Sequence, residues 1–215
     1  MIKKFVFKTL VALALSMSAA SAATLNFVGT GQTHLVTGND IDAAFNSEID
    51  IITGDQKTLT NGLFLDLAGG AAEITYTYMG FEAGNRNFAA VRGGGVFNNY
   101  GTSASYVGQQ LTAYQEASGL LQFAFGTVAP FRAIGLFVNS ALAYPASPEI
   151  AMGFSRIDAD SFYVLFDDIA AGDRDFDDLV MRIDVAAVPL PAGVLLLLSA
   201  ILAIAAVGRR QQRTI

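Results

Sequence analysis

The chain of 215 residues contains no cysteine and no tryptophan, and His34 is its single histidine. The absence of cysteine excludes disulfides, thiolate zinc sites, iron–sulfur clusters and a cysteine nucleophile. A metal site built from several histidines is excluded too, and a Ser-His-Asp hydrolase could use only His34. No G-x-S-x-G nucleophile motif occurs in the sequence, so we expect His34 to occupy an ordinary loop or strand position. These absences point away from an enzyme.

Acidic residues are missing from both ends of the chain. All 19 Asp and Glu lie within 23–187, together with only seven of the 13 Lys and Arg. The formal charge of this segment is therefore near −12, where the whole chain carries −6. Such a charge argues against nucleic acid and anionic membrane surfaces as partners. It favours solubility outside the cell and the binding of divalent cations.

The first 22 residues have the layout of a secretory signal peptide. Three lysines among the first eight residues precede a short apolar core, Leu10–Leu15, and Ala20-Ser21-Ala22 forms an A-x-A cleavage site. The alternative is a retained N-terminal anchor, but the apolar core is too short to span a bilayer comfortably. We expect a signal peptide over 1–22, cleaved before Ala23.

The C-terminal segment has the pattern of a single membrane span. Residues 192–208 contain no charge, and as a helix they would extend roughly 25 Å, enough for a bilayer core. Three arginines follow at once, namely Arg209, Arg210 and Arg213, and would stay on the cytoplasmic side. The alternative, a buried core helix, is disfavoured because no charged residue interrupts the run and a basic end follows at once. We expect a transmembrane helix that holds the exported domain on the periplasmic side.

A short motif precedes this helix, formed by Val188, Pro189, Leu190, Pro191 and Ala192. Together with the apolar helix and the basic end, it resembles the VPLPA variant (VPLPA-CTERM) of the PEP-CTERM bacterial sorting signal over 188–215. The resemblance implies recognition by an exosortase-type membrane protease. It further implies that the tail is removed or exchanged. The protein would then be delivered to the cell envelope or the extracellular space, in association with exopolysaccharide and biofilm.

The central segment, 23–187, is long enough for one domain and shows the pattern of an all-β fold. Seven short runs have the pattern of strands, because apolar and polar residues alternate in them or apolar residues fill them, and turn residues bound them. They are 63–67, 73–78, 120–125, 133–138, 150–154, 162–166 and 179–185. In the last run we expect Leu179, Met181, Ile183 and Val185 to face the core, with Arg182 and Asp184 toward water. No amphipathic helix of four turns is evident. We expect an antiparallel β-sandwich of jelly-roll type.

The stretch 98–119 is weakly patterned and rich in small polar residues. It predicts either a short helix over 108–117 or a surface loop. Its three tyrosines, Tyr100, Tyr106 and Tyr114, could stack on sugar rings, but aromatic residues are also ordinary packing anchors. We favour the second interpretation.

An acidic segment joins the runs 162–166 and 179–185, which the spacing predicts to be a hairpin. Calcium prefers several carboxylate oxygens from a flexible loop, and the candidate ligands are Asp167, Asp168, Asp173, Asp175 and Asp177. The alternative is a solvated acidic turn whose aspartates form Asx turns. The same segment resembles the closing hairpin of exported bacterial domains that precede such sorting tails.

These patterns predict an exported protein of the envelope or extracellular matrix, structural or adhesive in role and without enzymatic activity. The alternative is a calcium-stabilised carbohydrate-binding module that uses the tyrosines. A glycan-active enzyme is the third and most remote interpretation. Calcium is the one cofactor that the sequence suggests, and the membrane and an exosortase-type protease are the expected partners.

Overall fold

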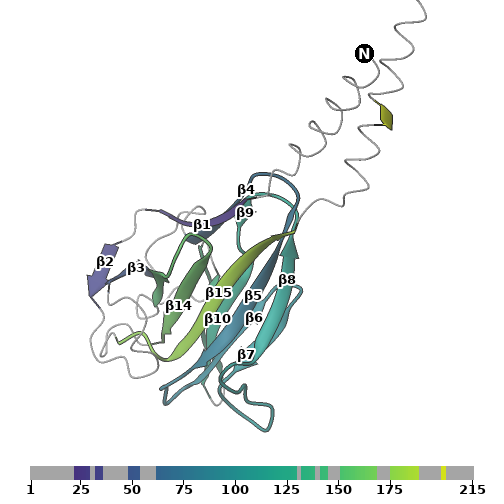
Figure 1. Ribbon diagram of the computed structural model, residues 1–215. Helices are drawn as coiled ribbons and strands as arrows, with labels where there is room; N and C mark the ends of the chain where they lie inside the picture. Colours follow the sequence, from purple (N-terminus) through teal and green to yellow (C-terminus); the bar gives the residue numbers. More distant parts are fainter. Residues whose placement is uncertain are drawn as a thin grey trace, which may run out of the picture.

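The computed structural model describes residues 22–29, 32–35, 48–53, 62–129, 132–138, 141–144, 151–168, 175–188 and 200–201. Within these ranges the domain is all-β, and its strands form three antiparallel sheets (Figure 1). The all-β class predicted from alternation is thereby confirmed. The predicted signal peptide lies outside the described residues except Ala22, and so does the predicted membrane helix except Ala200 and Ile201.

The largest sheet has seven strands. In spatial order they are β2 (Gln32–Leu35), β3 (Glu48–Thr53), β13 (Ala151–Arg156), β14 (Ser161–Asp167), β15 (Leu179–Val188), β5 (Ala71–Gly80) and β8 (Gln110–Gln115). Its centre is the hairpin β14–β15, in which Phe166 pairs with Leu179 and Ser161 with Asp184. The predicted hairpin is therefore present.

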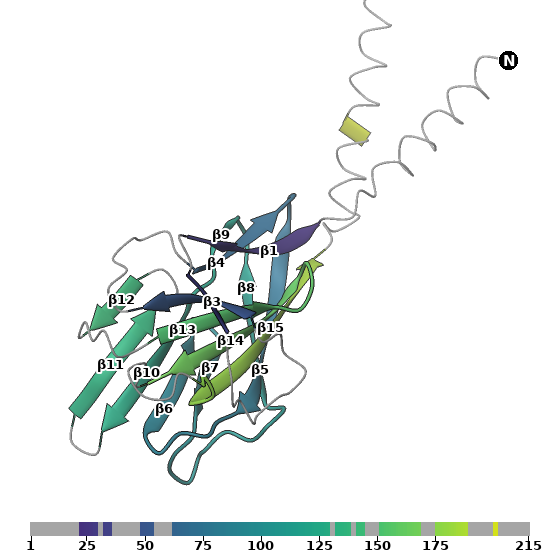
Figure 2. The same cartoon turned by 90° about the vertical axis from the view of Figure 1, so that its left-hand side faces the viewer.

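Two smaller sheets complete the fold. The second sheet has five strands, in the order β12 (Ala141–Tyr144), β11 (Arg132–Val138), β10 (Phe123–Ala129), β6 (Arg86–Val91) and β7 (Gly95–Asn98). The third has three, in the order β1 (Ala23–Val28), β4 (Gly62–Leu67) and β9 (Gly119–Leu120). Figure 2 shows the five-stranded sheet from the side.

Each of the seven predicted runs overlaps a strand, although the run 120–125 is divided between β9 and β10. The stretch 98–119 requires a correction, because both predicted alternatives missed strand β8. Gln110–Gln115 pairs antiparallel with β5 along Thr77 to Ala72. Its residues are compatible with a helix as well as with a strand. Pairing with the edge of β5 favours the strand, because strand formation depends on cross-strand contacts more than on local preference.

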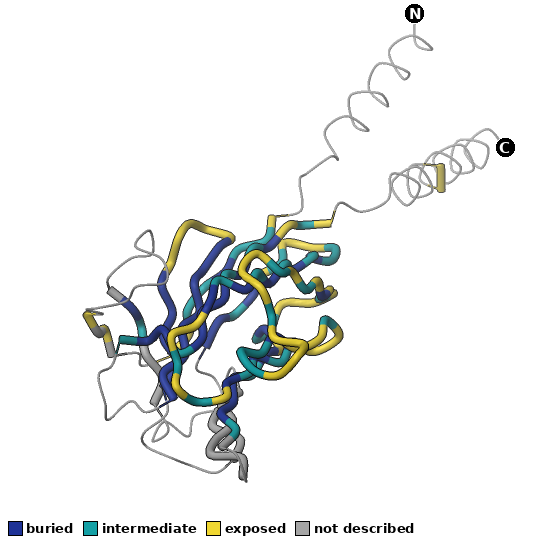
Figure 3. The backbone as a smooth tube through the Cα atoms, turned by 90° about the horizontal axis from the view of Figure 1, so that it is seen from below, coloured by how far each residue is buried: buried dark blue, intermediate teal, exposed yellow. Residues whose placement is uncertain are grey.

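Aromatic side chains pack the seven-stranded sheet against the five-stranded one. Phe125 of β10 stacks on Phe166 of β14 with ring centroids 5.2 Å apart and planes 6° from parallel. Tyr78 of β5 lies 5.6 Å from Phe97 of β7. Figure 3 shows buried residues gathered in the interior of the described β structure and exposed residues along outer turns. Six phenylalanines are buried in this core, namely Phe97, Phe123, Phe125, Phe154, Phe162 and Phe166.

Alternation decides which face of each central strand enters this core. Every second residue of β5 is buried, from Ala72 to Gly80. In β15 the predicted inward residues, Leu179, Met181, Ile183 and Val185, are all buried. Between them Arg182 and Asp184 are partly exposed and form a salt bridge of 2.6 Å, as expected for residues facing water.

Both ends of the described β structure lie beside one turn. At the start, the carbonyl of Ala22 accepts a hydrogen bond of 2.9 Å from the amide of Ala68. At the end, Val188 pairs with Ala71. Residues 68–70 form the turn between β4 and β5. The chain therefore enters β1 and leaves β15 at the same end of the molecule (Figure 1).

The helical residues that the structure describes amount to Ala200 and Ile201, both exposed. Within the described ranges, no helix has the length and apolar character needed to cross a bilayer.

Candidate functional site

The described residues of the acidic segment between β14 and β15 lie at the end of β15 opposite Val188, and therefore far from the start of β1 (Figure 1). Of the five predicted calcium ligands, Asp167 ends β14 and Asp168 follows it, and Asp175 and Asp177 precede β15. Asp173 lies outside the described residues. The structure therefore brings four of the five to one end of the hairpin.

Most of these carboxylates are buried. The exposed fraction is 1% for Asp167, 3% for Asp168 and 2% for Asp177, while Asp175 is partly buried. The alternative of a solvated acidic turn is therefore wrong for these three residues. A buried carboxylate is stable only when other groups compensate its lost hydration.

Asp168 has partners that the sequence analysis missed. Its Oδ1 accepts a hydrogen bond of 2.9 Å from the side-chain amide of Asn85, and its Oδ2 accepts one of 2.7 Å from Asn87. Asn87 belongs to β6, in the five-stranded sheet. The acidic segment is therefore fastened to the opposite sheet by amide-to-carboxylate hydrogen bonds, which are among the stronger ones in proteins.

Asn87 is the centre of this polar cluster. Its side chain is completely buried. Its Oδ1 accepts from the hydroxyl of Thr127 at 2.8 Å, and its Nδ2 also donates to the carbonyl of Asp178 at 3.3 Å. The backbone amide of Asn87 donates to Oδ1 of Asn99 at 2.8 Å, and Asn99 in turn donates to the carbonyl of Asn85 at 3.0 Å. A polar side chain whose donors and acceptors all form hydrogen bonds can be buried at little net cost in free energy.

The signal for this cluster in the sequence is an asparagine within a short apolar strand, in Asn87-Phe88-Ala89-Ala90-Val91. Asparagine is depleted in strands. A buried position with fixed partners is one reason for its presence here.

Asp178 is the titratable group of the cluster. Its Oδ2 accepts a hydrogen bond of 2.7 Å from the backbone amide of Asp168. Burial raises the pKa of Asp178 to about 7, and the negative charges of Asp168, Asp167 and Asp175 add to the rise. A proton or a cation would relieve this repulsion.

A strained backbone holds the segment against the outer face of the large sheet. Phe176 has φ of 60°, and its side chain is 1% exposed. It packs in a second apolar cluster, opposite the main core, with Ile49, Tyr163, Leu165 and Val180. A bulky residue at positive φ is uncommon and costs about 1–3 kcal/mol. Burial of the Phe176 ring offsets that cost and positions Asp175 and Asp177 on either side.

A calcium site requires several oxygen ligands that are free to bind the ion. The donor set is entirely oxygen, as calcium prefers. However, Asp168 uses both carboxylate oxygens for the amides of Asn85 and Asn87. Across the described residues, no group of three or more His, Asp or Glu is arranged to hold a metal ion. With Asp173 outside those residues, calcium binding stays a prediction.

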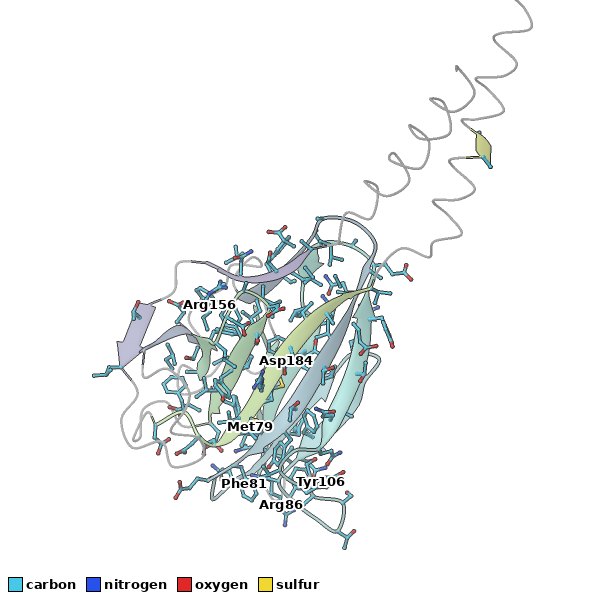
Figure 4. All side chains as sticks on the ribbon, viewed as in Figure 1. Met79, Phe81, Arg86, Tyr106, Arg156 and Asp184 are labelled. Atoms are coloured by element: carbon cyan, nitrogen blue, oxygen red, sulfur yellow. The ribbon has the colours of Figure 1, made fainter. Side chains whose placement is uncertain are left out.

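The tyrosines of 98–119 do not form one surface. Tyr106 is 71% exposed and lies just before β8, whereas Tyr114 is 67% exposed and lies well along that strand. Gln110, the first residue of β8, and Tyr114 are four positions apart, roughly 13 Å along the strand. Figure 4 shows Tyr106 at the same end of the domain as Phe81 and Arg86. His34 occupies β2, where its backbone pairs with Ile49.

No protein-family model, curated protein or solved structure matches this chain.

Proposed function

We propose that the chain is an exported protein of the bacterial envelope or extracellular matrix, anchored and sorted through its C-terminal segment, with a structural or adhesive role. One observation supports this proposal more than any other. The described strands begin at Ala23, the expected first residue after signal peptide cleavage, and end at Val188, the first residue of the sorting motif. Cleavage at both expected places would leave every described strand intact.

The position of the two ends also fits a tethered domain. Ala23 and Val188 both lie beside the turn at residues 68–70. A domain anchored beyond Val188 would therefore place this end toward the membrane and the acidic segment away from it. The charge of about −12 over 23–187 would favour solubility outside the cell. The finer description, a β-sandwich of jelly-roll type, is part of this proposal.

A deletion tests the anchoring directly. The full-length chain should fractionate with membranes before it reaches the envelope, because the apolar run would be inserted in lipid. A tagged chain lacking 188–215 should appear as a soluble exported protein. The same location and fate for both chains would contradict the proposal.

A substitution within the motif separates recognition from anchoring. Replacing Pro189 and Pro191 by alanine keeps the apolar run and the arginines. We expect this variant to remain uncut in the membrane, because the protease would no longer recognise its motif. Processing at the normal rate would show that the resemblance to the sorting signal does not extend to its use.

The second candidate function is a calcium-stabilised carbohydrate-binding module. The observation that favours calcium is the burial of three carboxylates beside Asp178, whose pKa is raised to about 7. Since both oxygens of Asp168 already accept hydrogen bonds, the other aspartates of the segment would provide the ligands. Calcium would replace the proton and remove the repulsion among these side chains.

A thermal melt tests calcium binding. A ligand that binds only the folded state adds about 2.7 kcal/mol at 100 times its Kd, so millimolar CaCl2 should raise the Tm at pH 8 relative to EDTA. The rise should be smaller at pH 5, where protons compete for the carboxylates. Magnesium should raise the Tm less than calcium does, because it prefers smaller sites with more regular geometry.

A matched pair of variants completes this experiment. Asp177→Asn should abolish the calcium-dependent rise in Tm, and Asp66→Asn, a change of an exposed aspartate on β4, should preserve it. A Tm that does not respond to calcium at pH 8 would refute the calcium proposal. We propose no catalytic role for the chain. That view would be overturned if the protein cleaved a polysaccharide and if substitution of a single carboxylate abolished this cleavage.

A further inference from the structure

The outer face of the five-stranded sheet is apolar. Alternate residues of β6 and β10 are buried against the seven-stranded sheet, among them Phe125. The residues between them point the other way, because successive side chains of a strand lie on opposite faces. Of these outward residues, Phe88, Ala90 and Ala124 are partly exposed, and Val96 of β7 is 51% exposed. Apolar side chains therefore remain in contact with water on this side of the domain.

The register of the strands arranges these outward residues in rows. Ala90 pairs with Val96 of β7 on one side and with Ala124 of β10 on the other. In the adjacent row Phe88 pairs with Gly126. A shallow hollow of about 520 Å³ opens on the same face beside the β6–β7 turn, and Ala90, Val96 and Ala124 are part of its lining. The face is thus a continuous apolar surface with a hollow at one end.

The five-stranded sheet contains no acidic residue, although residues 23–187 hold all 19 of the chain. The sequences of β6, β7, β10, β11 and β12 lack Asp and Glu altogether. Arginines lie at the border of the sheet instead. Arg86 and Arg132 are the first residues of β6 and β11, and the exposed Arg92 follows β6. The outer face of the seven-stranded sheet differs, because Glu73 and Asp184 are partly exposed there.

We propose that the outer face of the five-stranded sheet binds the same face of a second copy of the chain, so that two such sheets stack in a two-fold symmetric dimer. Protein interfaces are depleted in Asp, Glu and Lys and enriched in Phe and Arg, and this face has that composition. Two domains with a charge near −12 repel each other. This face allows them to meet without opposing carboxylates.

A second copy fits this face better than a lipid surface does. Proteins that lie on a membrane insert large apolar side chains between lipids. Here the centre of the face is formed by Ala90, Ala124 and Gly126, whose short side chains allow another sheet to approach. Stacked sheets lie about 10 Å apart. The net negative charge of the domain also repels anionic lipid.

The size of the face sets the strength of the dimer. Five strands about 4.8 Å apart, each of four to seven residues, cover roughly 20 Å by 20 Å. Two such faces would bury on the order of 800–1,000 Å² together, which is at the lower end for specific interfaces. We therefore expect a dimer that dissociates reversibly at micromolar concentrations.

This inference goes beyond the proposed structural or adhesive role by naming a partner and the surface that binds it. It depends on neither export nor sorting, because the strands that begin at Ala23 and end at Val188 belong to the other two sheets. A failed sorting experiment would leave it standing.

Sedimentation equilibrium of the full-length chain in a density-matched detergent tests the dimer. The fraction of dimer should rise with protein concentration. It should also rise with NaCl, because salt screens the repulsion between the two acidic domains. A monomer at every concentration up to the millimolar range would overturn the proposal. A dimer that weakens with salt would depend on ion pairs and would overturn it as well.

Two variants locate the interface. Ala124→Glu places a carboxylate on each of the two facing sheets and should weaken the dimer about tenfold or more. Thr112→Glu is the matched control, a change of an exposed residue on β8, and should form the dimer as wild type does. Equal dimerisation by wild type and Ala124→Glu, or loss with Thr112→Glu alone, would refute this face.

The absence of cysteine permits a second test that alters the domain less. Ala90→Cys introduces a single thiol on the face, and a flexible bismaleimide should link two copies of this variant. Thr112→Cys should remain unlinked. Linkage of Thr112→Cys alone, or of neither variant, would overturn the proposal. A monomer in nanodiscs whose probe on Ala90→Cys is quenched by spin-labelled lipid would assign the face to the membrane instead.

Discussion

Replacing Asn87 by leucine should destabilise the folded protein by about 3–5 kcal/mol, because it leaves buried polar groups without their partner. Oδ2 of Asp168 would lose its 2.7 Å amide hydrogen bond, and the hydroxyl of Thr127 would lose its acceptor. Leucine is close to asparagine in size, so the loss measures hydrogen bonding rather than a cavity. Urea unfolding of the full-length chain, followed by circular dichroism, would measure the change.

Asn26→Leu is the matched control. Asn26 lies on β1 and makes an exposed contact of 3.4 Å with Asp66, so its replacement should change stability by only about 0.5 kcal/mol. Removing both Asn87 and the carboxylate it serves, in Asn87→Leu with Asp168→Leu, should cost less than the sum of the single changes. Equal losses for Asn87→Leu and Asn26→Leu would contradict the role assigned to the polar cluster.

The stability of the domain should fall as the pH rises from 4 to 7. The pKa of Asp178 is raised in the folded state from 3.8 to about 7. A group with a raised folded pKa contributes stability that is fully present below its unfolded pKa and is lost as the pH passes the folded pKa. The window of this loss is therefore pH 4–7. After discounting for the partial exposure of Asp178, we expect about 1–2 kcal/mol.

Asp178→Asn isolates this contribution. An asparagine oxygen can still accept the hydrogen bond from the amide of Asp168, but it does not titrate. We expect the variant to lose most of the dependence on pH in this window. Asp160→Asn is the control, because the pKa of exposed Asp160 is also raised, chiefly by its hydrogen bond with Asp158. A profile for Asp178→Asn identical to that of wild type would place the pH response elsewhere.

Strong alternation was sufficient to predict β15 and β5, and a continuous apolar run predicted β14. In 181–185 the buried residues fall at every second position, so the sequence determines both the strand and its inward face. Strand β8 escaped prediction because its local pattern is ambiguous. Its conformation is decided by pairing with β5, which the sequence alone does not specify.

The acidic segment shows the same limit at the level of the site. Its position at one end of a hairpin followed from spacing. The burial of Asp168 did not, because the amides that compensate it come from Asn85 and Asn87, more than 80 positions earlier in the chain. Residues so distant in sequence have no local pattern that connects them. Charged runs are usually solvated, and that general rule misled the alternative interpretation here.

We propose that the folded domain is delivered and released by processing at both ends of the chain. The intact mass of the mature protein, isolated from its native host, tests this most directly. We predict a chain that begins at Ala23 and ends close to Pro191, with or without a group added by the sorting machinery. A mature chain that continues to Ile215 in every cell fraction would contradict the account.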